Sequence, residues 1–115
     1  MGAIVVITTV GTEEEANSLA AELVGRRHAA CVNVLPIARS VYRWQGKIRE
    51  DSEFLLLIKS VSDRYPAIEA AIQELHSYEL PEILCLNVGD GEQKYLRWLS
   101  ESVDRDSPTV RGSDE

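Results

Sequence analysis

The spacing of hydrophobic positions changes several times along the chain, and each change marks a new element. Short apolar runs rich in β-branched residues predict strands, because such side chains pack well on a pleated surface. Apolar residues three and four positions apart predict helices instead. Strands are predicted over residues 3–9, 30–44, 47–60 and 80–88. Helices are predicted from residue 12 to near residues 25–28, and over residues 62–75 and 92–103.

Polar residues at the helix boundaries support this division. Thr12 followed by Glu15 has the spacing of a capping box, in which each side chain satisfies a free backbone N–H of the first turn. Ser62 or Asp63 can cap the second helix, and Pro66 is tolerated in its first turn because no hydrogen bond is lost there. Both helices therefore have a recognisable start.

The element order is strand-helix-strand-strand-helix-strand, followed by a third helix. This order predicts an α+β fold, a ferredoxin-like βαββαβ sandwich with a long central hairpin and an extra C-terminal helix. At 115 residues the chain has the length of one domain. We assign residues 1–103 to that domain and residues 104–115 to a polar, disordered tail, because these last residues lack apolar periodicity.

The two middle strands are unusually long. Each arm of the hairpin has about 14 residues, whereas a typical strand has about 5–6. A hairpin arm that is longer than the rest of its sheet leaves backbone groups unpaired. It also exposes apolar and aromatic side chains, here those of Val41, Tyr42, Trp44 and Ile48. The sheet face without helices also needs cover. Both features predict self-association through sheet faces and hairpins, and the alternative is a shorter hairpin with a mobile tip.

Charge and hydropathy narrow the possible partners. The formal net charge of −7 argues against nucleic acid, which proteins bind mainly through cationic contacts to phosphates. No apolar run approaches the roughly 20 residues that span a bilayer, and residues 1–11 lack the features of a signal peptide. We therefore expect a cytoplasmic protein with neither a nucleic-acid nor a membrane partner.

Cysteines and catalytic motifs add little chemistry. Cys31 and Cys85 have no metal-site spacing, and apolar neighbours favour reduced, buried thiols for both. No nucleophile motif, zinc-protease motif or phosphate-binding loop is present. The chain is therefore predicted not to be an enzyme.

The stretch HSYELPEI, residues 76–83, contains the best candidates for a metal site. His76, Glu79 and Glu82 together offer one imidazole and two carboxylates, a plausible set for copper or another divalent cation. Cys31 would add a soft ligand if it faced the same cleft. The alternatives are that His76 caps the end of the second helix and that the glutamates form salt bridges between subunits.

Several motifs resemble those of the CutA family of divalent-cation tolerance proteins. The stretches RRHAACVNVLP, SVYRWQGKIREDSEFLLLIK, ELHSYELPEIL and YLRWL match that family in order and spacing, over about residues 4–100. The resemblance implies a ferredoxin-like protomer in a homotrimer whose long hairpins reach across to neighbouring subunits. It also implies a role in tolerance to copper and other divalent cations, with copper binding as a property linked to the family.

Two further points follow from the resemblance. Some family members have a cysteine near the end of the first strand, where this chain has Thr8 and Thr9, and hydroxyls are poor copper ligands. The architecture also resembles that of PII signalling proteins, which bind effectors in clefts between subunits. A regulatory or scaffolding trimer that binds a small effector or a protein partner is therefore the alternative function.

Overall fold

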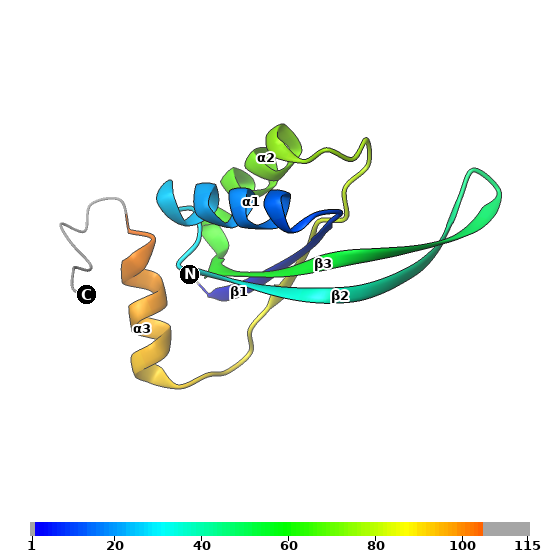
Figure 1. Cartoon of the computed structure of the whole chain (residues 1–115). Helices are drawn as coiled ribbons and strands as arrows, with labels where there is room; N and C mark the ends of the chain where they lie inside the picture. The colour runs from blue at the N-terminus through cyan, green and yellow to red at the C-terminus, as the bar shows by residue number, and fades with distance from the viewer. Residues whose placement is uncertain (1, 105–115) are drawn as a thin grey trace.

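A computed structural model describes residues 2–104, except for the side chain of Ile37. Its elements form a single antiparallel sheet, with strand order β2-β3-β1-β4, and helices beside it (Figure 1). In chain order they are β1 (Ala3–Val10), α1 (Glu13–Gly25), β2 (Cys31–Trp44), β3 (Lys47–Val61), a 3-10 turn (Ser62–Arg64), α2 (Tyr65–Leu75), β4 (Leu84–Asn87) and α3 (Gln93–Ser102). The predicted ferredoxin-like α+β fold is confirmed.

The core lies between one face of the sheet and helices α1 and α2, which both cover that face (Figure 1). Side chains alternate along a strand, so every second residue of β1 points to the helices. Ile4, Val6 and Val10 are accordingly buried, and Leu56 and Ile58 of β3 join them. This single apolar layer fixes the register of the central strands.

Helix α1 begins where the sequence predicted. The Thr12 side chain accepts a hydrogen bond from the backbone N–H of Glu15, 3.1 Å away. The Glu15 carboxylate does not return this contact to Thr12, because it binds Ser77 instead. Only half of the expected capping box forms, and its other half connects the helix to a distant turn.

Helix α2 begins later than predicted. Ser62 and Asp63 lie in the 3-10 turn, Arg64 is the N-cap residue, and no side chain caps either start. Pro66 in the first turn fixes the backbone without losing a hydrogen bond. The expected apolar face is nevertheless correct, since Ile68 and Ile72 are fully buried.

Strand β4 is shorter than predicted. It spans Leu84–Asn87, whereas the sequence pattern suggested residues 80–88. Pro81 has no backbone donor for a ladder, and the Leu80 side chain is 70% exposed. Residues 76–83 therefore run as irregular chain past the end of β1.

The long hairpin is confirmed. Strands β2 and β3 have 14 and 15 residues, against eight in β1 and four in β4. The register shifts between Leu35 and Ala38, around Pro36, as expected for a residue that cannot donate to the ladder. The distal part of the hairpin projects well beyond the rest of the sheet (Figure 1).

The second sheet face carries no helix and is largely apolar. The strand register places the side chains of Val5, Ile7, Leu57, Leu84 and Leu86 together on this open face. Leu84 and Leu86 are 55% and 51% exposed. An apolar sheet face of this kind is the sort of surface that a protein usually covers.

Other expectations have mixed outcomes. Neither cysteine is buried: Cys85 on the edge strand β4 is exposed and Cys31 is half-buried, because both strands lie at a sheet edge. Both are free thiols, as expected.

Residues 105–115 of the predicted tail lie outside the described residues. In the described part of the chain, no helix is long and apolar enough to cross a membrane.

The core layer can be tested at Leu56, which is fully buried between the sheet and the helices. Leu56→Ala should lower the free energy of unfolding by about 2–5 kcal/mol, because it removes apolar contacts and leaves a cavity. Val24→Ala, on the 42% exposed outer side of α1, should change it by less than about 0.5 kcal/mol. Urea denaturation of both variants at one protein concentration measures the difference, and equal losses would contradict this core.

Candidate functional site

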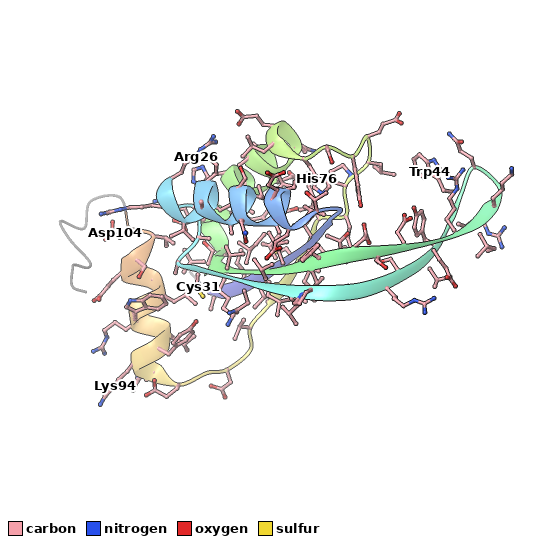
Figure 2. All side chains as sticks on the ribbon, in the orientation of Figure 1. Arg26, Cys31, Trp44, His76, Lys94 and Asp104 are labelled. Atoms are coloured by element: carbon pink, nitrogen blue, oxygen red, sulfur yellow. The ribbon has the colours of Figure 1, made fainter. Side chains whose placement is uncertain are left out.

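His76 ends helix α2 and has a buried ring (Figure 2). Its Nε2 lies 2.7 Å from the backbone oxygen of Thr9, at the end of β1. Its Nδ1 accepts a hydrogen bond of 3.0 Å from the backbone N–H of Tyr78. The backbone N–H can only donate, so Nδ1 carries no proton and Nε2–H donates to Thr9.

These contacts define His76 as a neutral imidazole with both nitrogens in use. The Glu15 carboxylate lies 3.6 Å from Nδ1, which would be an ion pair only with a protonated ring. The hydrogen bond from Tyr78 rules out that protonation in this arrangement. A metal ion would have to displace one of the two hydrogen bonds, so the structure favours the alternative reading of His76 as a helix-end residue.

A second contact fixes the same turn. Both oxygens of the Glu15 carboxylate accept hydrogen bonds from Ser77, one from the backbone N–H at 2.9 Å and one from the hydroxyl at 3.0 Å. Helix α1 therefore holds the start of the 76–83 segment, while His76 joins it to β1. These two contacts decide where the following residues lie.

The central feature of the site is Glu53, a residue that is only 6% exposed and carries a carboxylate. It accepts hydrogen bonds from the Ser40 hydroxyl of β2 and from the Tyr78 hydroxyl, 2.7 Å away. Burial, together with the hydrogen bond to Glu53, raises the pKa of Tyr78 well above its usual value. Tyr78 therefore remains a proton donor, and the cluster links the hairpin to the turn after α2.

A groove of about 1140 Å³ runs between the distal hairpin and the 78–82 segment. The predicted ligands Glu79 and Glu82 both line it, across from Asp51 and Glu53 of β3. Aromatic side chains form much of the remaining wall, and Tyr42 donates a hydrogen bond to Asp51 there. The groove thus combines carboxylates with rings, as a site for a cation or a planar ligand would.

Cys31 lies away from this groove. It pairs with Lys59, whereas Thr9, the partner of His76, pairs with Leu55. Four residues along β3 correspond to about 13 Å, and Figure 2 places the labelled Cys31 and His76 apart. Within residues 2–104 of a single chain, no three His, Cys, Asp or Glu side chains are grouped so that they could hold a metal ion.

The four predicted ligands therefore divide. Glu79 and Glu82 come together in one groove, His76 is engaged with the backbone, and Cys31 is remote. The predicted set is not assembled within one chain, because the strand register separates Cys31 from the turn. Metal binding by any of these residues stays a prediction.

Sequence reasoning missed Glu53, Ser40 and Glu15 as site residues. Glu53 is a charged residue that directly precedes the apolar run of β3. This position is the only sign in the sequence that it has a special role. Its partners lie 13 and 25 positions away, and only the strand register and the turn bring them together.

Comparison with known proteins gives consistent matches. The family model described as CutA1 divalent ion tolerance protein matches residues 4–102. The divalent-cation tolerance protein CutA of Thermus thermophilus is 45% identical over 99 residues, which are 86% of this chain and 96% of that protein. The crystal structure of CutA1 from Oryza sativa is 37% identical, with a TM-score of 0.88 over 91% of this chain and 96% of that one.

One comparison contradicts an expectation. A structure from Archaeoglobus fulgidus, 30% identical with a TM-score of 0.86 over 89% of this chain and 99% of that one, is described as a periplasmic divalent cation tolerance protein CutA. The predicted cytoplasmic location is therefore wrong as an inference from this sequence. The physical reason is that charge and hydropathy determine how a domain folds and not the compartment that holds it.

The Glu53 cluster can be tested with Tyr78→Phe. The variant removes one of two donors to a buried carboxylate and should lower the free energy of unfolding by about 1–3 kcal/mol at pH 7. Because folding raises the pKa of Tyr78, this residue contributes its full stabilisation to the folded parent protein below a pH of about 10. That contribution is lost as the pH rises further. The variant should therefore lose less stability than the parent between pH 9 and about 11.

The matched control is Tyr95→Phe, which removes an exposed hydroxyl that has no hydrogen bond among the described residues. Its stability should follow that of the parent at every pH. Chemical denaturation across the pH series measures both variants, and identical profiles for Tyr78→Phe and Tyr95→Phe would contradict the cluster.

Proposed function

The chain belongs to the CutA1 divalent ion tolerance family, and from this premise we propose that it acts as a homotrimer that binds copper or another divalent cation. Family membership supports a role in metal ion tolerance. The name of the family describes tolerance of divalent ions and no catalysed reaction, and we propose no enzymatic step.

The observation that carries the metal proposal is the groove that Glu79 and Glu82 share with Asp51 and Glu53. Carboxylate oxygens suit hard divalent cations, whereas copper prefers imidazole and thiolate ligands. His76 would bind a metal only after it gives up its hydrogen bond with Tyr78 or with Thr9. The proposed ligands are therefore Glu79 and Glu82, together with groups of a neighbouring subunit. This ligand set should bind harder divalent ions more tightly than copper.

Assembly is supported first by the open sheet face. Val5, Ile7, Leu57, Leu84 and Leu86 form a contiguous apolar surface that no helix of the described chain covers. Burying such a surface releases about 25 cal/mol per Å² of apolar area. Packing of open faces around a common axis would bury it in every subunit.

The edge of β3 supports assembly independently. Strand β1 stops at Val10, opposite Phe54, so residues 47–53 of β3 have a strand neighbour only on the β2 side. Their outward N–H and C=O groups can pair with a strand of another subunit. The same region forms one wall of the groove, which places the proposed cation site beside the neighbour.

Calorimetric titration with Mn²⁺, Zn²⁺ and Cu²⁺ tests the metal proposal. The double variant Glu79→Gln/Glu82→Gln should bind the preferred ion at least about tenfold more weakly, since it removes both charged ligands while keeping their shape. The control Glu13→Gln/Glu101→Gln neutralises two exposed carboxylates outside the groove and should bind like the parent.

Two outcomes would contradict the metal proposal. One is that no ion gives measurable heat, and the other is that the two double variants bind equally well. If nucleotides or common metabolites bind the metal-free protein instead, the groove with Tyr42, Trp44 and Tyr78 favours the alternative, a PII-like regulatory trimer with a small effector.

Light scattering tests assembly. The parent should have about three times the chain mass of 12.8 kDa. Leu84→Glu places a charge on the open face and should shift the mass toward the monomer, whereas Val24→Glu on the outer side of α1 should not. A parent that is monomeric at micromolar concentration would overturn the proposed homotrimer.

A further inference from the structure

The groove beside the hairpin carries charges of both signs. Three arginines of β2 and β3, Arg39, Arg43 and Arg49, line it together with the four carboxylates described above. A positive side chain repels a bare divalent cation, and a carboxylate repels a free anion. The charge pattern therefore suits a ligand that is itself cationic in one part and anionic in another.

Arg49 is the arginine that lies beside the carboxylates. Because side chains alternate along a strand, Arg49 shares one face of β3 with Asp51 and Glu53, in steps of about 6.6 Å. Glu53 accepts its hydrogen bond from Tyr78 on this face, so the face is turned toward the segment after α2. The register also places Tyr42 directly opposite Arg49, on the same face. A small ligand at the acidic side chains therefore also reaches the guanidinium of Arg49.

Two of the three arginines have no acidic partner of their own. Arg39 is occupied, because it forms an ion pair with Glu50 at 2.8 Å. Arg43 and Arg49 are exposed, and neither forms an ion pair within residues 2–104. A guanidinium binds carboxylate and phosphate oxygens through two parallel hydrogen bonds. Arg49 is therefore available to an oxyanion from outside the chain.

The acidic side chains leave part of a cation's coordination open. Glu53 already accepts two hydrogen bonds, and Asp51 accepts one from Tyr42. Glu79 and Glu82 supply at most two oxygens each, whereas hard divalent cations take about six to eight. A second molecule can supply other oxygens, and the groove of about 1140 Å³ has room for one, since small-molecule sites measure roughly 300–1,000 Å³.

We propose that the groove binds the divalent cation together with a small anionic chelator, a polycarboxylate or an oligophosphate. Glu79 and Glu82 bind the cation, and the chelator fills positions that remain in its coordination sphere. Arg49 holds an oxyanion of the chelator that faces away from the cation. This inference rests on the proposed cation site and specifies the chemical form in which the ion is bound. The chain then recognises a chelated ion in preference to a bare one.

Equilibrium dialysis of the full chain tests this with radiolabelled citrate and, in a separate series, radiolabelled pyrophosphate. Each anion is offered alone and with an equimolar amount of Mn²⁺. Mn²⁺ should raise the affinity for at least one of the two anions by about tenfold or more, because cation and oxyanion bind the same groove cooperatively. The series that responds tells whether the chelator is a carboxylate or a phosphate.

The variant Arg49→Gln tests the arginine. It should bind the complex of Mn²⁺ and anion at least about tenfold more weakly, because the charged, two-pronged contact is lost. It should also bind Mn²⁺ alone more tightly than the parent, because a repelling charge is removed, and a damaged fold would not produce that gain. Arg97→Gln, at an exposed position of α3, is the matched control and should follow the parent in both measurements.

Each of the other outcomes overturns the inference. If Mn²⁺ binds but neither anion is retained with it, binding of a chelated ion is wrong and the proposed cation site stands. If an anion is retained equally well without Mn²⁺, the groove is a simple anion site. If Arg49→Gln and Arg97→Gln behave alike, Arg49 does not hold the chelator. If Mn²⁺ is bound neither alone nor with an anion, the proposed cation site fails as well.

Discussion

Strand β1 is about half as long as its neighbour β3, and most features of the molecule follow from that mismatch. Where β1 ends at Val10, the hairpin continues with backbone paired on one side only. The groove lies beside this part of β3, where β1 no longer pairs with it. Residues 78–82 line the other side of the groove. The distal part of the hairpin also projects well beyond the rest of the sheet (Figure 1). The groove and the exposed edge of β3 are both consequences of one unequal strand pairing.

The turn after α2 is held by hydrogen bonds to three other elements of the fold. His76 ties it to β1, Glu15 ties it to α1, and Tyr78 ties it to the buried carboxylate of Glu53. These contacts place Glu79 and Glu82 at the groove, which both residues line. Neither side chain forms a hydrogen bond or an ion pair with another described residue. Of the predicted ligands in this turn, His76 thus supports the backbone, and Glu79 and Glu82 remain available for a cation.

The sequence predicted the fold well, because apolar spacing records which side of each strand and helix is buried. It predicted the long hairpin from the two extended arms, residues 30–44 and 47–60. It overestimated β4, since the apolar run continues through a proline that cannot pair. It could not predict the Glu53 cluster, which depends on how residues far apart in the chain meet. The same limit applied to Cys31, whose distance from His76 is set by strand register.

We propose that the unpaired edge of β3 and the open sheet face are covered by other subunits. Hydrogen exchange measured by mass spectrometry on the concentrated protein tests this directly at residues 47–53. Amides of β3 that point away from β2 should exchange slowly, like those of the core strand, because a neighbouring strand accepts their hydrogen bonds. If these amides exchange at the rate of an unprotected chain while the core stays protected, the edge is bare and the proposed assembly is wrong.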